Sequence, residues 1–120
     1  MKVLLDTSFI ISCINKRIDF LSELESQGFK VLVPHEVFQE LKDVKNKVSH
    51  ESKISIDVAF DLFNKRKIDK MTLGGRNVDE GLIKKGNEGY YIATLDSGIK
   101  SKVPKKVVLI KSKNTIGVED

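Results

Sequence analysis

The chain has 120 residues, of which 40% are hydrophobic and 32% charged, and its formal net charge is +4. This length fits one domain, residues 1–120, that can fold without a disulfide or a structural metal. Cys13 is the single cysteine, which excludes an intrachain disulfide and favours a small core residue over a nucleophile. No apolar run approaches the ~20 residues of a membrane span, and Asp6 interrupts the start before a signal-peptide core forms. We therefore expect a cytoplasmic protein without a membrane partner.

The positive charge is compatible with a polyanionic partner but does not establish one. The sequence has no Trp, 6 Phe and 2 Tyr. A surface on which nucleic-acid bases stack, as in single-strand-binding proteins, is therefore not expected.

The first half of the chain alternates short apolar runs with helical patterns. The first run predicts a buried strand that delivers Asp6 to its carboxyl end. Thr7 or Ser8 can cap the next helix, Gly28 ends another, and Pro34 leads into a third. In chain order we expect a strand at residues 2–5, a helix to about residue 15, a helix at 19–26, a strand at 30–33 and a helix from 34 onward.

The second half opens with a polar segment, residues 46–53, that predicts a loop or a frayed turn. Gly74-Gly75 predicts a break in the chain, Asn77 can cap the helix that follows it, and Gly86 lies near the end of that helix. The polar tail after residue 110 predicts no further element. The expected elements are a helix at residues 54–63, a weak strand at 67–73, a helix from 77, a strand at 90–95, a short helix at 97–102 and a strand at 107–110.

Strands that are apolar throughout, alternating with helices, predict an α/β domain whose mainly parallel sheet is covered by helices on both faces. In such folds, ligands bind beyond the carboxyl ends of the strands. Asp6 and Asp96 each end a predicted strand at that edge. Their shared position is the first indication of a functional site.

Two further acids, Glu40 and Asp79, lie on helices that can begin at the same edge as Asp6 and Asp96. Four carboxylates in one cleft repel one another unless a cation neutralises them. Mg²⁺ and Mn²⁺ prefer oxygen ligands of this kind. Such ions activate water for attack on a phosphodiester, a reaction that needs neither a protein nucleophile nor a histidine.

Polar residues near these acids fit the same chemistry. Hydroxyl groups can orient the carboxylates or hold metal-bound water, and lysines can hold a phosphate backbone. The hydroxyl candidates are Thr7, Ser8, Thr94 and Ser97. The lysine candidates for RNA contact are Lys42, Lys84, Lys85, Lys100 and Lys102. His35 and His50 are expected at the surface without a catalytic role.

Each acid also has a purely structural interpretation. Asp6 and Asp96 can cap the helices that follow them, and Asp79 in a first turn can interact with the helix dipole. Glu40 can be solvated on a charge-rich helix, although it lies closer to the apolar face than the outward-facing Asp43. A structural role remains open for each acid taken alone, and the choice depends on whether the four acids occur together in a known pattern.

Four segments of the chain resemble the PIN domains, a family of metal-dependent nucleases. Leu4-Leu5-Asp6-Thr7-Ser8-Phe9-Ile10 resembles the family's opening strand with its first acid. The other three resemble the helix with its glutamate, the helix start with the third acid and the strand that ends in the fourth. These three segments are residues 33–41, 77–83 and 91–96.

The resemblance implies Mg²⁺- or Mn²⁺-dependent cleavage of single-stranded RNA, with Asp6, Glu40, Asp79 and Asp96 as the metal-binding and catalytic acids. Many relatives carry a further acid where this chain has Ser97-Gly98-Ile99-Lys100, so the number of ions stays open. The implied settings are a toxin of the VapC type with an inhibitory antitoxin, or an RNA-processing endonuclease that works with ribosome-assembly partners. A homodimer through apolar helix surfaces is a further option.

Two rival functions remain. A receiver-type phosphoacceptor domain is also a small α/β fold, and Lys111 follows the last predicted strand as a receiver's lysine would. It also requires an acidic pair after the first strand, where only Asp6 stands, and an Asp at the end of the third strand, whereas Asp69 lies inside its segment. The other rival is a catalytically silent PIN-like module that binds RNA or protein.

Overall fold

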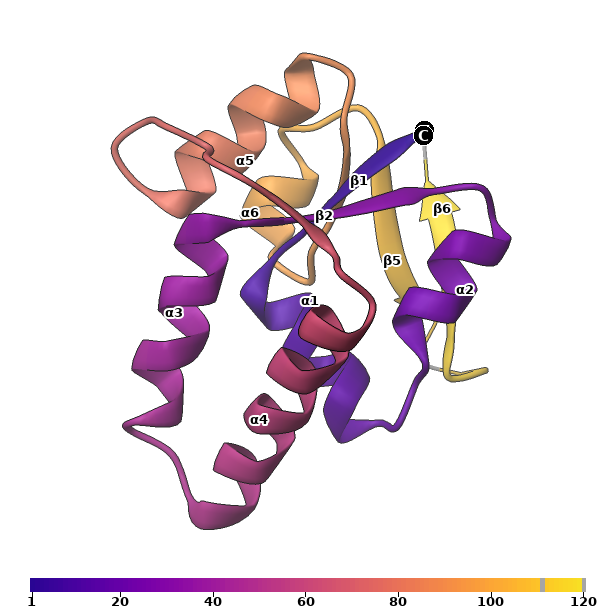
Figure 1. The fold of residues 1–120 in the computed structure, drawn as a ribbon. Coiled ribbons are helices and arrows are strands. Elements are labelled where there is room, and N and C mark those ends of the chain that lie inside the picture. Colours follow the sequence, from indigo (N-terminus) through magenta and orange to yellow (C-terminus); the bar gives the residue numbers. More distant parts are fainter. Residues whose placement is uncertain (111, 120) are drawn as a thin grey trace.

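A mixed sheet organises the computed structural model, which describes residues 1–110 and 112–119 (Figure 1). Within these residues the sheet has 6 strands in the order β3-β2-β1-β4-β5-β6, of which the first five are parallel and β6 is antiparallel to β5. The strands are β1 (Lys2–Leu5), β2 (Lys30–Pro34), β3 (Asp69–Met71), β4 (Tyr91–Ala93), β5 (Lys106–Ile110) and β6 (Thr115–Glu119). The predicted fold class, an α/β domain with a mainly parallel sheet, is confirmed.

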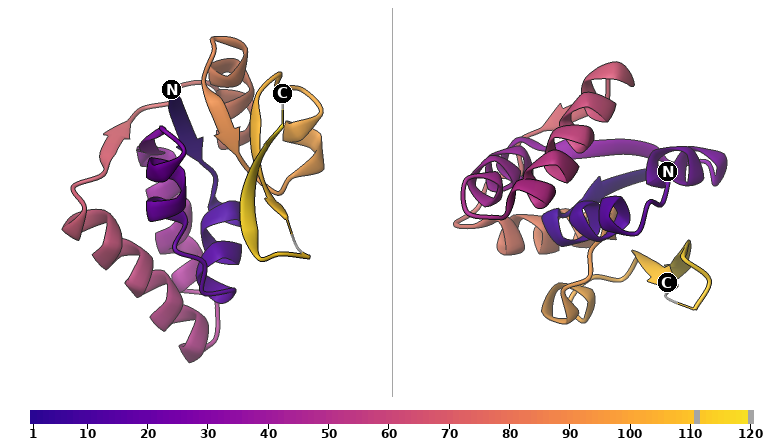
Figure 2. Two further views of the ribbon diagram at one scale, coloured as in Figure 1. Left: turned by 90° about the vertical axis from the view of Figure 1, so that its right-hand side faces the viewer. Right: turned by 90° about the horizontal axis from the view of Figure 1, so that it is seen from below.

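Helices cover both faces of this sheet (Figures 1 and 2). Four of them, α1 to α4, pack with one face, and α5 and α6 pack with the other. The helices are α1 (Thr7–Asn15), α2 (Phe20–Ser26), α3 (His35–Lys45), α4 (His50–Lys65), α5 (Val78–Asn87) and α6 (Ser97–Lys100). None of the helices described is both long and apolar enough to cross a membrane.

The apolar run of β1 shows no alternation of polar and apolar residues, because β1 is a central strand covered on both faces. Val3 and Leu5 enter the core beneath α1 to α4, whereas Leu4 enters the core beneath α5 and α6. All three side chains are fully buried, because successive residues of a strand point to opposite faces and both faces are covered. Cys13 is also fully buried, and burial raises the pKa of its thiol to about 12, which fits the expected core role.

Two expectations about the elements were wrong. Residues 46–53 are not all loop, because α4 begins at His50 with Ser49 as its cap, whose hydroxyl accepts from the Ser52 N–H. The first turn of this helix is solvated, so it carries no apolar pattern to reveal it. The polar tail contains β6, which pairs with β5 and buries Ile116. An edge strand that buries one large side chain gives too short an alternation to recognise.

The remaining differences are in length. The strand predicted at residues 90–95 stops at Ala93, and the weak strand predicted at 67–73 is reduced to Asp69–Met71 at the sheet edge. The short helix expected to reach residue 102 ends at Lys100. Lys111, on which the receiver alternative relied, lies outside the described residues.

Candidate active site

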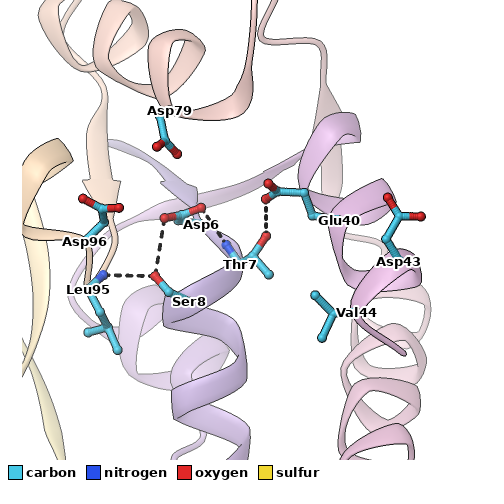
Figure 3. A pocket seen from close by; sticks show the side chains of 9 residues that line it. All are labelled: Asp6, Thr7, Ser8, Glu40, Asp43, Val44, Asp79, Leu95 and Asp96. Atoms are coloured by element: carbon cyan, nitrogen blue, oxygen red, sulfur yellow. Dashed lines mark hydrogen bonds between the residues drawn. The ribbon is translucent and has the colours of Figure 1, made fainter. Parts of the chain in front are cut away.

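A cleft of about 600 Å³ opens at the carboxyl edge of the sheet (Figure 3). The four predicted acids each follow one of the four adjacent strands β3, β2, β1 and β4, and they reach the cleft from the segments after those strands. The residues that line the cleft are Asp6, Thr7, Ser8, Glu40, Asp43, Val44, Asp79, Leu95 and Asp96. The topology therefore brings together acids that are up to 90 residues apart in the sequence (96 − 6).

Asp6 lies at the floor of the cleft, directly after β1. Its side chain is only 6% exposed, and its backbone N–H donates to the Ala93 carbonyl over 2.9 Å. Asp6 Oδ1 accepts from the Thr7 N–H at 2.8 Å, and Oδ2 accepts from the Thr94 hydroxyl at 2.6 Å. The Ser8 hydroxyl is 3.4 Å from Oδ2 and adds a weaker contact. These bonds fix the orientation of the carboxylate.

Thr94 connects the two strands that carry Asp6 and Asp96. Its side chain is fully buried, and its hydroxyl oxygen accepts from the Asp96 N–H at 3.1 Å while donating to Asp6. Ser8 makes a parallel link, because its hydroxyl oxygen accepts from the Leu95 N–H at 3.2 Å. The segments after β1 and β4 are thus held in register by side chains and by the sheet.

Glu40 reaches the cleft from the second turn of α3. Its Oε1 accepts from the Thr7 hydroxyl at 2.6 Å, so Thr7 contacts Asp6 through its backbone and Glu40 through its side chain. Asp43, one turn further along α3, also lines the cleft. Asp43 is exposed, as its outward-facing position on α3 predicts, and the open cleft extends far enough to include it.

Asp79 and Asp96 complete the acidic lining. Asp79 is exposed in the first turn of α5 and points into the cleft above Asp6 (Figure 3). Asp96 is the N-cap of α6, where its Oδ1 accepts from the Ile99 N–H at 3.1 Å. Asp6 likewise caps α1. Both caps exist, and the same carboxylates line the cleft, so the structural and functional interpretations do not exclude each other.

The electrostatics of the cleft disfavour charge on its inner carboxylates. Burial raises the pKa of Asp6, the charge of Asp79 adds to this, and the hydrogen bonds from Thr94 and Thr7 partly offset it. Burial also raises the pKa of Glu40, with a further increase from the nearby acids. No Lys, Arg or His is among the described residues that line the cleft. The acids therefore have no cationic partner from the protein.

This arrangement gives a pH-dependent stability when divalent ions are removed. The folded pKa of Asp6 lies above its ordinary 3.8, so the folded state holds this proton more tightly than the unfolded chain. The contribution of Asp6 to stability is present below 3.8 and is lost as pH rises through its raised pKa. Urea unfolding in EDTA across this window is expected to show that Asp6→Asn gains stability over the wild type as pH rises. A difference that does not change with pH would contradict the assignment.

The donor set fits a hard divalent cation. Five carboxylates from four segments share the cleft, and hydroxyl groups orient the two inner ones, Asp6 and Glu40. Among the described residues, no three His, Cys, Asp or Glu side chains stand close enough to hold an ion in their present positions. Carboxylates without a neutralising charge repel one another, so the acids of this cleft would have to close on an ion by side-chain rotation.

Sequence reasoning missed Glu36, which supports the cleft from outside. Its carboxylate accepts from the Leu73 N–H at 3.0 and 3.1 Å and from the Gly74 N–H at 3.2 Å. Burial opposes its charged form, but these backbone hydrogen bonds prevail and lower the pKa of Glu36. The loop held in this way leads into α5 and Asp79. Its partner is 37 residues away, so no local pattern signals the contact.

The predicted lysines do not line the cleft. Lys42 borders a separate hollow between α3, α4 and β3, and Lys85 is 3.5 Å from Glu88. Lys84 and Lys102 are exposed and Lys100 is half-buried. Of the four hydroxyl candidates, Thr7, Ser8 and Thr94 bond to the acids, whereas Ser97 is exposed at the start of α6 and is not among the lining residues.

The sequence profile of the PIN like domain matches residues 3–113, so the chain belongs to this family. One similar solved structure is "Structure of the PIN domain endonuclease Utp24", at 18% identity and a TM-score of 0.74, covering 98% of this chain and 90% of that one. Another is VapBC2 from Rickettsia felis bound to a promoter DNA fragment, at 13% identity and a TM-score of 0.55, covering 85% of this chain and 93% of that one. None of the curated protein sequences matches this chain.

The family match confirms the resemblance drawn from the four segments. At these identities the solved structures show a shared fold. The strand order also argues against the receiver alternative, because receivers of the flavodoxin type place β1 between β2 and β3. Here β1 lies between β2 and β4. Asp69, on edge strand β3, pairs with Lys30 at 3.2 Å and is outside the lining of the cleft.

Proposed function

We propose that this protein is a metal-dependent endoribonuclease that hydrolyses phosphodiester bonds of single-stranded RNA. The observation that carries the proposal is Asp6, a residue only 6% exposed that shares with four further acids a cleft whose described lining holds no cationic side chain. A buried acid without a positive partner is costly, so its retention is best explained by a cation that binds there. Membership of the PIN-like family supports the nuclease assignment.

The four acids have different parts in this proposal. Asp6, held by Thr7 and Thr94, is the fixed ligand, and Asp79 and Asp96 are the exposed ligands that can rotate to meet the ion. Glu40 is oriented by Thr7 from the other side of the cleft. Mg²⁺ or Mn²⁺ bound by these groups would supply water activation and stabilisation of the leaving oxygen.

Two biological settings suit such an enzyme, and each is supported by one of the similar structures. Similarity to the Utp24 endonuclease supports an RNA-processing role, and similarity to VapBC2 supports a toxin neutralised by an antitoxin. Both settings place the protein in the cytoplasm or with RNA-containing assemblies, and both allow a homodimer. The cleft chemistry is the same in the two cases.

The test is cleavage of a single-stranded RNA by the purified protein with Mn²⁺ or Mg²⁺, with and without EDTA. We expect cleavage that EDTA abolishes and that Asp79→Asn and Asp96→Asn each reduce by about 10²-fold or more. Asp69→Asn is the matched control, because Asp69 is exposed on β3 outside the cleft lining. Single-stranded DNA in parallel tests the choice of substrate. Metal binding by a folded protein that cleaves no RNA would instead support the catalytically silent module.

A further inference from the structure

A second recess lies beside the acidic cleft, between α3, α4 and β3, with a volume of about 480 Å³. Its lining differs in character from that of the cleft, because it has basic, amide and aromatic groups and no carboxylate among the described residues. We call it the basic hollow. Its lining residues are His35, Phe38, Gln39, Lys42, Phe60, Asn64 and Lys70.

Helix α3 separates the two recesses and contributes to both. Three α3 residues at positions i, i+4 and i+7 line the hollow, namely His35, Gln39 and Lys42. Each of these residues is followed directly by an acid, so Glu36, Glu40 and Asp43 form a second row with the same spacing. At 3.6 residues per turn the two rows are about 100° apart. The basic row and the acidic row are thus adjacent stripes on one helix.

The hollow offers N–H donors for an anion. Lys42 and Lys70 form no ion pair within residues 1–110 and 112–119. Lys70 Nζ is 4.7 Å from the centroid of the Phe38 ring, and this ring also packs against Phe60 and Phe63. Because the ring is already engaged by the protein, donors rather than a free aromatic face are available for recognition. The Gln39 amide already donates to Asp43 at 3.1 Å, so the two lysines are the donors for phosphate oxygens.

The acidic cleft leaves the binding of a polyanion unexplained by itself. Its five carboxylates repel phosphate groups, and no cationic side chain is among its described lining residues. The affinity for an RNA backbone must therefore come from a neighbouring surface. The basic hollow lies on the adjacent stripe of α3 and holds Lys42 and Lys70.

We propose that the basic hollow binds backbone phosphates of the RNA strand whose scissile phosphate lies in the acidic cleft. This rests on the proposed function, and it adds the path of the substrate: the strand crosses α3 from the acidic row to the basic row. Recognition there is of the phosphodiester backbone and carries no base preference.

The experiment measures binding of a labelled single-stranded RNA in EDTA, where no metal-dependent cleavage occurs. We expect the double variant Lys42→Ala/Lys70→Ala to bind the RNA roughly tenfold more weakly. The plot of log affinity against log salt concentration should also become less steep, by about 1.4, because each lost phosphate contact accounts for ~0.7 on a single strand. Lys42→Arg/Lys70→Arg should retain most of the affinity, because it keeps both charges.

The matched control is Lys2→Ala/Lys105→Ala. Each of these lysines lies over a tyrosine ring, at 6.0 and 5.4 Å from its centroid, and both stand at the amino ends of strands, away from the cleft. Equal losses in both double variants, or an unchanged salt slope in Lys42→Ala/Lys70→Ala, would overturn the proposal. Because binding is read without catalysis, this result is independent of whether the cleft proves to cleave RNA.

Discussion

Asp6→Asn is expected to abolish metal-dependent RNA cleavage, with a loss of at least about 10³-fold, while the protein stays folded. The loss follows because this substitution removes the charge of Asp6, the buried carboxylate that Thr7 and Thr94 hold in place, and so removes the ligand that anchors the ion. A factor of this size corresponds to about 4 kcal/mol of transition-state stabilisation.

The fold is expected to survive because asparagine can replace the hydrogen bonds of Asp6. Its amide oxygen can accept from the Thr7 N–H, and its NH₂ group can donate to the hydroxyl oxygens of Thr94 and Ser8. It also removes a buried charge that has no cationic neighbour among the residues lining the cleft. In EDTA the variant should therefore be as stable as the wild type at neutral pH, or more stable.

Two measurements separate this result from simple misfolding. Single-turnover cleavage gives the loss of activity, and the thermal midpoint with and without Mn²⁺ gives binding, since a ligand of the folded state raises that midpoint. The wild type and the Asp69→Asn control should both gain stability from Mn²⁺, and Asp6→Asn should gain none. An Asp6→Asn protein that still cleaves RNA in a metal-dependent way would rule out the proposed site.

The acids at strand ends were predictable from local patterns. An apolar run followed by an acid indicates a buried strand and a carboxylate at its carboxyl end, which located Asp6. Asp96 was located in the same way, although β4 itself ends at Ala93. The hydroxyls Thr7, Ser8 and Thr94 were found because they are neighbours of these acids in the sequence, and the structure places all three in contact with Asp6.

The part that sequence could not supply depends on contacts between distant segments. Asp43 was assigned to the outer face of α3, yet it is only about 60° around the helix from Glu40, and the cleft is wide enough to include it. Glu36 binds backbone N–H groups of a loop that follows two further elements of the chain. The basic hollow joins Lys42 to Lys70, which is 28 residues away in the sequence (70 − 42) and belongs to another element. Contacts between such distant residues depend on how the helices pack against the sheet.

Gly81→Ala is expected to reduce cleavage by about 10²-fold and to weaken metal binding, because it displaces the first turn of α5 that carries Asp79. A Cβ at Gly81 would stand 2.8 Å from the Gly74 carbonyl oxygen and 2.8 Å from Leu73 Cβ, closer than side chains and backbone normally approach. The loop cannot easily yield, since the Glu36 carboxylate holds Leu73 and Gly74. Gly74 also has a φ of +74°, a conformation that favours glycine. A displacement of about 1 Å at a reacting group costs on the order of 10²-fold.

Gly86→Ala on the same helix provides the comparison. Its Cβ would meet Val103 Cγ1 at 2.5 Å and Ile92 Cγ1 at 3.1 Å in the core beneath α5, away from the cleft lining. Overpacking of this kind costs about 1–3 kcal/mol of stability. Gly86→Ala should therefore lower the thermal midpoint while the folded fraction keeps its Mn²⁺ affinity and its cleavage rate. For Gly81→Ala the Mn²⁺ affinity should fall even when the two variants are compared at temperatures at which their folded fractions are equal. If both variants lose stability and neither loses Mn²⁺ affinity, the prediction is wrong, and the Gly81 contact does not position Asp79 for metal binding.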